Sequence, residues 1–442
     1  MSDCKVAFGL HGQYGTVYTD LQMFELPRER VGLGLGEKWK SFMKVYMTFV
    51  TVYRSPDECP EHTVPHHCRA QLKAMGYYPN SEERRIPGRR TWFLFLFSQM
   101  TMFFCSQCYG IFDSMDDLVE WGRDLAFIIA SFFIYFKFIY FLLYADNVDE
   151  VVDGLEECYR WERAGPAASG VRSAKRLHYL IIIGMQIIWV VSMVAFVLLL
   201  VTTPLWTQQD LPLHVSYPFH LHDSSKHPVT HILIYISQSW SILYFLTGLI
   251  STEGLSITIY SQLTTGLTVL CVELRHLHQL CDGDEDLLRW EINRLVKYHQ
   301  KIISLVDRSN EVFHGPLIMQ MIVNFLLVSL SVFEAMMARH DPKVAGQFIL
   351  LMILALGHLS MWTKFGDMMS QESLEVAEAA YEAYDPNVGS KKIDCHIRLI
   401  MLRAQEPLIM RATPFPTFNM INYKAILNQC YGILTLLLNT LD

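Results

Sequence analysis

The last apolar stretch of the chain, residues 416–441, constrains the fold more than any other feature. Arg398, Arg403 and Arg411 precede it, and only the acidic Asp442 follows it. Lys and Arg residues mark the cytoplasmic side of membrane helices. The pattern therefore predicts a membrane span whose C-terminal end lies outside the cell.

Seven apolar blocks lie along the chain, and each comes near the roughly 20 residues that a helix needs to cross a bilayer. Apolar residues make up 51% of the 442 residues and charged residues only 18%, which is unusual for a soluble protein. The blocks are residues 91–112, 124–145, 177–203, 229–262, 316–338, 344–362 and 416–441. The sequence therefore predicts an all-α membrane protein with seven transmembrane helices.

Basic residues are distributed unequally between the loops on the two sides of this predicted bundle. Residues 1–90, 146–176, 263–312 and 364–411 contain 13, 5, 6 and 6 Lys or Arg residues. The loops on the other side contain only Arg123, Lys226, Arg339 and Lys343. The positive-inside rule then predicts a cytoplasmic N-terminus and an extracellular C-terminus.

The spans and the segments between them divide the chain into six predicted regions. In residues 287–305 apolar side chains recur at spacings of three, four and seven, which is typical of a helix. We therefore expect helical extensions of spans 4 to 6 to form a cytoplasmic anchor region. The regions are an N-terminal cytoplasmic segment (1–90) with an interfacial helix (39–54), transmembrane helices 1–4 (91–262), cytoplasmic anchor helices (263–312), transmembrane helices 5 and 6 (313–366), a cytoplasmic helical segment (367–415) and transmembrane helix 7 (416–442).

No motif in the sequence indicates an enzyme, a cofactor site or a nucleic-acid interface. The sequence has no glycine-rich phosphate loop, Gly-x-Ser-x-Gly elbow or His-Glu-x-x-His motif, and no basic patch with interleaved aromatic residues. The histidines of the loop 204–228 either bind a metal or belong to a solvated aromatic loop above a cavity, which we favour. They are His214, His220, His222 and His227.

Several short motifs, in order along the chain, resemble those of the insect odorant receptor family. Each is weak alone, but their order across seven spans is specific. The chain is most similar to an odour-tuning subunit, because it lacks the longer insertion of the shared co-receptor. The motifs are Gly76-Tyr77-Tyr78-Pro79, Lys137, Leu211-Pro212-Leu213 with Tyr217-Pro218-Phe219, Tyr298-His299-Gln300 with Asn310 to Phe313, Ser373 to Tyr381, Arg403 to Leu408, Phe418, and Cys430 to Leu437.

This resemblance implies an odorant-gated, non-selective cation channel in the plasma membrane of olfactory sensory neurons. It implies a hetero-oligomer with the odorant receptor co-receptor, with a tetramer expected, and a volatile odorant, the lipid bilayer and permeating cations as the other partners. A gustatory receptor is an alternative, although span 7 lacks that family's Thr-Tyr and Gln-Phe run. A metabotropic seven-helix receptor would need an external N-terminus. A transporter is disfavoured by the odd number of spans.

The resemblance also implies that span 7 lines the pore. On a helix, one face of this span alternates leucines, which can close a narrow pore by dewetting, with polar side chains that can solvate an ion. Alternatively, this face packs against neighbouring spans. The predicted pore residues are Tyr431, Leu434, Thr435, Leu438 and Asn439.

The resemblance places the odorant site in the outer half of the bundle, between spans 2, 3, 4 and 6. Aromatic side chains there would supply apolar contact, and a few polar groups would orient an ester, an alcohol or a carbonyl group. Membrane helices also use such residues simply to pack together. The predicted ligand-binding residues are Ile129, Phe132, Phe133, Ser192, Phe196, Tyr235, Gln238, Ser239, Gln347 and Phe348.

Ionisable residues within the predicted spans, such as Lys137, Glu334 and Lys424 at the inner end of span 7, need an explanation. A charge inside a bilayer costs a few kcal/mol unless its side chain reaches the interface or meets a partner. Lys137 lies in the inner half of span 2 and Glu334 near the outer end of span 5. We expect both side chains to extend to the nearest interface and to anchor their helices there.

Overall fold

Long helices make up the part of the chain that the structure, a computed structural model, describes. Every regular element among the described residues is a helix. The interfacial helix expected over residues 39–54 lies outside them. The described residues are 68–69, 72–73, 76, 87–159, 166–205, 211–217, 221, 224, 226–281, 284–338, 342–384 and 391–441.

Each of the seven predicted spans falls on a helix. Five of these helices are long and apolar enough to cross a membrane, namely α5, α7, α8, α10 and α11. The other two, α4 and α13, contain 24 and 22 residues but are less apolar. The helices are α4 (Pro87–Gly110), α5 (Leu118–Leu143), α6 (Ala145–Tyr159), α7 (Ala168–Thr202), the 3-10 turn η3 (Thr203–Leu205), α8 (Pro228–Arg275), α9 (Leu277–Cys281), α10 (Glu285–Met337), α11 (Pro342–Glu382), α12 (Lys391–Ala404) and α13 (Met420–Leu441).

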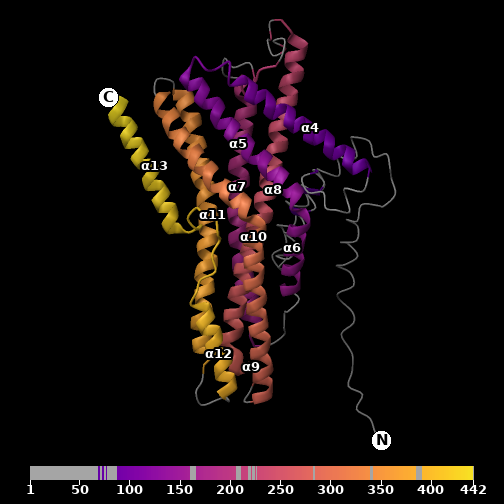
Figure 1. Ribbon diagram of the computed structural model, residues 1–442, viewed down its shortest axis with the longest axis vertical. Helices are drawn as coiled ribbons and strands as arrows, with labels where there is room; N and C mark the ends of the chain where they lie inside the picture. The colour runs from indigo at the N-terminus through magenta and orange to yellow at the C-terminus, as the bar shows by residue number, and fades with distance from the viewer. Residues whose placement is uncertain are drawn as a thin grey trace. The chain divides into compact units, whose positions relative to one another are not determined.

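The helices α5, α8 and α11 begin at the upper end in Figure 1, where α7 and α10 end. We call this the upper end of the bundle. The short helices α9 and α12 lie at the opposite, lower end (Figure 1).

Helix α8 occupies the centre of the bundle and packs against α5, α7, α10 and α11. Within its most apolar 18 residues 72% of the positions are buried, compared with 22% in α7. Many of its serine and threonine hydroxyl groups donate to carbonyl oxygens within the helix, as where Thr252 Oγ1 donates to the carbonyl oxygen of Gly248 at 3.0 Å. Small side chains whose hydroxyl groups are hydrogen-bonded within their own helix let neighbouring helices approach closely. Helix α7, in contrast, leaves much of its apolar surface uncovered.

Helices α8, α10 and α11 extend well beyond their apolar blocks towards the lower end. Helix α8 continues to Arg275, and α10 begins at Glu285, where Asp284 caps the helix by accepting hydrogen bonds from two backbone amides. Arg275 forms ion pairs with Glu375 and Glu382 of α11. The predicted helical extensions are therefore present, and ion pairs link them at this end.

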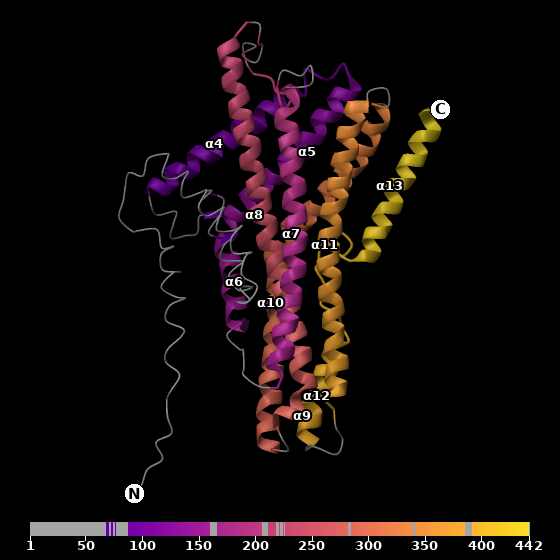
Figure 2. The same ribbon diagram turned by 180° about the vertical axis from the view of Figure 1, so that it is seen from behind.

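Helix α13 is attached to the rest of the bundle mainly through its beginning. It contacts α10 and α11, and it diverges from α11 towards the upper end in both views (Figures 1 and 2). Just before it, Phe418 is buried, whereas the α13 residues Ile421 and Tyr431 are 79% and 68% exposed. Much of the helix surface is thus uncovered in the single chain.

Candidate functional site

A small cavity lies towards the upper end of the bundle, between α5, α7 and α11. Its volume is about 10 Å³, which is roughly the space that one water molecule needs. Drug-sized ligands occupy pockets of several hundred Å³, so side chains or helices must move to admit one. Phenylalanine and leucine side chains form most of the walls. The lining residues are Arg123, Phe127, Phe196, Leu199, Leu200, Thr203, Gln347, Phe348 and Leu351.

Three of the predicted ligand-binding residues line this cavity. They are Phe196 of α7 and Gln347 and Phe348 of α11. The spacing along each helix brings them to the same end of the bundle, and Phe348 is almost fully buried. The cavity therefore combines aromatic walls with one amide, and Arg123 and Thr203 add polar groups that the sequence did not single out.

Two further predicted residues lie in the apolar core that adjoins the cavity. Phe133 is a buried member of this core, together with Leu351 from the cavity wall and Cys430 of α13. Ile129 packs against the same core, as does Phe196. Helices that carry the cavity and the first half of α13 thus share one packed cluster.

The other predicted ligand-binding residues lie elsewhere. Phe132 is 41% exposed, and its ring lies 6.2 Å from that of Phe104 on α4. The Ser192 hydroxyl donates to the carbonyl oxygen of Ile188 within α7. Tyr235 donates from its hydroxyl group to the carbonyl oxygen of Val201 at 3.0 Å, which links α8 to α7.

The last two, Gln238 and Ser239, lie on α8 below a polar loop. Gln238 Oε1 accepts a hydrogen bond of 3.3 Å from the backbone amide of Leu213. The Gln238 amide nitrogen and the Ser239 hydroxyl are buried without a hydrogen-bond partner among the described residues. These two groups are therefore available to a ligand or a water molecule, although neither lines the cavity.

The loop at residues 211–217 is fixed to the upper end of α5 by a histidine. His214 Nδ1 lies 2.6 Å from Asp124 Oδ2, which also accepts a hydrogen bond of 2.8 Å from the Ser114 hydroxyl. The hydrogen bond to Asp124 raises the pKa of His214 above its ordinary value of 6.5. His214 thus has a carboxylate partner, while His220 and His222 lie outside the described residues. Among the described residues, no cluster of three or more His, Cys, Asp or Glu could hold a metal.

The predicted pore residues all lie on α13, towards its end. Tyr431 is exposed, and the Thr435 hydroxyl donates to the carbonyl oxygen of Gly432 at 2.9 Å. The side chains of Leu434, Leu438 and Asn439 lie outside the described part of the chain. Whether this face lines a pore therefore stays a prediction.

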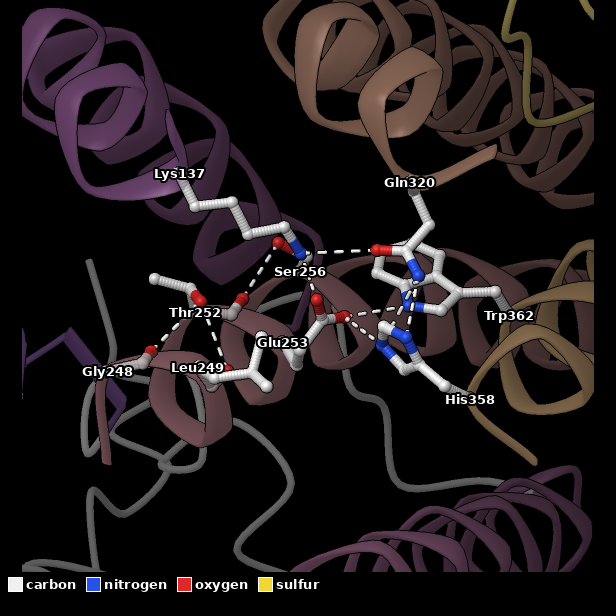
Figure 3. A network of polar contacts seen from close by, with 9 residues as sticks. All are labelled: Lys137, Gly248, Leu249, Thr252, Glu253, Ser256, Gln320, His358 and Trp362. Atoms are coloured by element: carbon white, nitrogen blue, oxygen red, sulfur yellow. Dashed lines mark hydrogen bonds and ion pairs between the residues drawn. The ribbon is translucent and has the colours of Figure 1, made fainter. Parts of the chain in front are cut away.

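Lys137 does not extend to an interface, so that expectation was wrong. Its ammonium group is buried and forms an ion pair with Glu253 in the middle of α8 (Figure 3). A bilayer-buried charge can be neutralised by a partner from another helix as well as by reaching the headgroups. The sequence did contain the necessary signal, because Glu253 is a single acid within the apolar block 229–262.

The expectation for Glu334 was wrong as well. Its side chain is fully buried, and its carboxyl group lies directly against Gly122 of α5. Only a glycine leaves room for it there, since a Cβ atom at this position would overlap the carboxyl group. Neither carboxyl oxygen has a hydrogen-bond partner among the described residues. The glycine therefore allows Glu334 to turn into the bundle rather than outwards.

Comparisons with known proteins agree with the resemblance seen in the sequence. The family model described as 7tm Odorant receptor matches residues 117–431. The chain is 53% identical to the Putative odorant receptor 65c of Drosophila melanogaster over 402 residues, which cover 91% of this chain and 98% of the relative. It is 48% identical to Odorant receptor 65a of the same species, covering 91% of this chain and 97% of that one.

A solved structure with the same fold is that of the insect olfactory receptor OR5 from Machilis hrabei. The TM-score is 0.71 at 14% sequence identity, and the match covers 85% of this chain and 97% of the other. An all-helical, multi-pass membrane fold and the family match thus agree with the predicted fold class. The family is one of receptors rather than enzymes. The chain belongs to the insect odorant receptor family.

Proposed function

We propose that this chain is an odour-tuning receptor subunit that opens a cation-conducting pore together with the odorant receptor co-receptor. The observation that carries the proposal is the apolar cavity between α5, α7 and α11, in a chain of the odorant receptor family. Its phenylalanine and leucine walls suit a volatile, mostly apolar molecule, and Gln347, Thr203 and Arg123 can orient a single polar group.

The proposed orientation has the upper end of the bundle outside the cell. Thirty of the Lys and Arg residues lie in the segments assigned to the cytoplasm, and four lie in the other loops. The positive-inside rule supports this orientation strongly. The loop that carries His214 and the cavity then both lie on the extracellular half, where an odorant arrives, in the plasma membrane of the sensory neuron.

Helix α13 is the proposed pore helix. Its exposed surface in the single chain suits contact with other subunits and with the permeating ions. Leu434 and Leu438 are the proposed gate, with Tyr431, Thr435 and Asn439 on the same face. Four such helices around a common axis would provide a ring at each level, which is why we propose a tetramer with the co-receptor.

Current recordings test this function. Cells that express the chain with the co-receptor are exposed to a panel of esters, aldehydes, terpenoids and eugenol, which is bound in one structure of the Machilis hrabei receptor. We expect an odour-evoked cation current that cells with either protein alone do not show for the same odour. Epitope tags at both ends, read in intact and permeabilised cells, test the orientation. An external N-terminal tag together with a current that requires G proteins would favour the metabotropic alternative.

The position of the ligand is tested by enlarging the cavity. Phe348→Ala removes a buried ring from the wall and should change the half-maximal concentration of active odorants by about 10-fold or more, since a buried aromatic side chain contributes 1.5–3 kcal/mol. Phe95→Ala, on the exposed face of α4, is the matched control. Equal tuning of wild type and Phe348→Ala, at equal surface expression, would place the ligand elsewhere.

A further inference from the structure

The carboxylate of Glu253 is buried at the centre of the bundle, and other side chains occupy both of its oxygens. Oε1 pairs with the Lys137 ammonium group. Oε2 accepts a hydrogen bond of 2.7 Å from the Trp362 indole nitrogen and lies 3.2 Å from His358 Nε2. Only 1% of the Glu253 side chain is exposed, so water does not compete for these oxygens.

A second layer fixes the geometry of these partners. Gln320 Nε2 lies 2.7 Å from His358 Nδ1, and Gln320 Oε1 lies 3.4 Å from the Lys137 ammonium group (Figure 3). If the amide nitrogen donates to Nδ1, the imidazole proton resides on Nε2 and points at Glu253. The indole of Trp189 stacks on the His358 ring with centroids 4.5 Å apart. Side chains of α5, α7, α8, α10 and α11 therefore meet around one carboxylate.

The network continues from Trp362 to the beginning of α13. The Trp362 ring lies 5.9 Å from the ring of Phe418, which is buried two residues before Met420, the first residue of α13. One turn further along α11, Gly366 allows the Phe418 carbonyl group to approach its backbone closely. The segment before α13 is therefore packed directly on the part of α11 that Glu253 holds.

The network also adjoins the helices of the cavity. The Lys137 ammonium group lies 4.4 Å from the centroid of the Phe133 ring. Phe133 is buried in the core that includes Leu351 of the cavity wall and Cys430 of α13. A displacement of α5 or α11 at the cavity would therefore act on the side chains around Glu253, because closely packed helices transmit strain to their neighbours.

We propose that Glu253 is a positioning residue: through the Trp362 hydrogen bond it holds the segment before α13 and couples movements of the cavity helices to that helix. The coupling role rests on the proposed function, in which α13 forms the pore. The holding role does not, since it follows from contacts within the single chain. The two can therefore be tested separately.

The test uses a substitution that removes the hydrogen bond but keeps the ring. Trp362→Phe deletes the indole N–H that Glu253 accepts and leaves an aromatic ring beside Phe418. Trp189→Phe is the matched control, because Trp189 is also buried and stacks within the network, but its indole nitrogen has no hydrogen-bond partner among the described residues. Glu253→Gln is less suitable, since it leaves the Lys137 charge buried without a counter-charge.

Hydrogen exchange of the purified full-length chain measures the holding role without any ligand. We expect backbone amides of residues 415–423 to exchange about 10-fold faster or more in Trp362→Phe, because a hydrogen bond to a charged group typically contributes such a factor. Trp189→Phe should exchange like the wild type in this segment. Unchanged exchange in Trp362→Phe, or the same increase in both variants, would overturn the proposal.

Current recordings then measure the coupling role with the most potent odorant of the panel, together with the co-receptor. We expect Trp362→Phe to lower the maximal odour-evoked current by about 5-fold or more, at unchanged surface expression and with an unchanged response to a direct co-receptor agonist. A parallel loss of surface expression and of both currents would mean a purely structural role and would overturn the coupling. A wild-type chain that gives no odour-evoked current would instead contradict the proposed function, while the exchange result would still decide the holding role.

Discussion

Two of the ion-pair groups that join helices in this receptor differ mainly in their access to solvent. At the lower end, Arg275 pairs with Glu375 and Glu382, and these three side chains are 33%, 40% and 47% exposed. At the centre, Lys137 and Glu253 are 4% and 1% exposed. Exposed pairs typically contribute 0–1 kcal/mol, whereas removing one partner of a buried pair costs about 3–5 kcal/mol.

The bundle depends more on its polar contacts at the centre than at the lower end. The carboxylate and guanidinium groups of the lower pairs can exchange their partners for water, so breaking one of these pairs leaves no charge buried without a partner. The central pair has no such alternative, because every oxygen of Glu253 is bonded to another helix. The centre is therefore the level at which movements of separate helices are most tightly linked.

The largest effect is expected from breaking the central pair. Lys137→Met or Glu253→Gln alone leaves a single buried charge and should lower the free energy of unfolding by about 3–5 kcal/mol. The double variant removes both charges and should recover most of this loss. The measurement is the midpoint temperature of unfolding of the detergent-solubilised protein, together with surface expression in cells.

The double variant also provides the control for this prediction. If Lys137 and Glu253 did not neutralise each other, each single substitution would lower the free energy of unfolding only slightly. The two losses would then add in the double variant. Additive losses in the double variant, measured under the same conditions, would therefore contradict the interpretation that each charge is needed to neutralise the other.

The next largest effect concerns the contact between α11 and the segment before α13. A Cβ atom at Gly366 would lie 2.1 Å from the carbonyl oxygen of Phe418, so the backbone must shift. We expect Gly366→Ala to lower the free energy of unfolding by about 1–3 kcal/mol, as overpacking does. Gly357→Ala, on the same helix and with nothing within 4 Å, should be neutral or slightly stabilising. Similar unfolding temperatures for both variants would contradict the close approach.

The fold could be predicted from the sequence because a membrane leaves the backbone few options. A chain that crosses lipid must satisfy its own amides and carbonyls, so an apolar block of suitable length becomes a helix. The block 344–362 accordingly lies within α11, and the block 177–203 lies within α7 except for its last residue. The continuation of α8 to Arg275 was also predicted as a helical extension, and there packing, rather than lipid, buries Leu263, Leu267 and Leu274.

The site was predictable only in part, since it depends on which side chains of different helices meet. The family resemblance assigned Phe196, Gln347 and Phe348 to one site, and these three line one cavity, while their part in ligand binding stays a prediction. Neither the sequence pattern nor the resemblance indicated that Arg123 of α5 lines the same cavity. The pairing of Glu253 with Lys137 was not predicted either. The sequence of α8 shows an acid within an apolar block, but it does not show which side chain of another helix lies opposite.

A smaller effect is expected for the pair of His214 and Asp124 at the upper end, which is more exposed than the central pair and less exposed than the lower pairs. The His214 side chain is 35% exposed, and its partner Asp124 is buried. Because the folded-state pKa of His214 lies above 6.5, the pair stabilises the loop fully below about pH 6.5 and loses this contribution as the pH rises through the folded-state pKa. The nearby Glu120 favours the charged form and Arg123 opposes it.

The measurement is the unfolding temperature of the wild type relative to His214→Gln, followed over pH. The difference should be largest below about pH 6.5 and should decline as the pH rises through the folded-state pKa of His214, above which both proteins carry a neutral side chain at this position. A difference that grew with rising pH would show that neutral His214, rather than the ion pair, stabilises the loop.

The smallest effect is expected for the ion pairs of Arg275 at the lower end. Arg275→Gln should lower the free energy of unfolding by no more than about 1 kcal/mol, because the guanidinium group and its two carboxylate partners are substantially hydrated. Salt should reduce even this difference, since the Debye length falls to about 3 Å at 1 M ionic strength. The loss caused by Lys137→Met should persist in the same salt, because ions do not reach a pair that is buried in the bundle. Unfolding temperatures measured in low and high salt separate the two cases, and equal salt sensitivity at both sites would mean that solvent reaches the central pair as well.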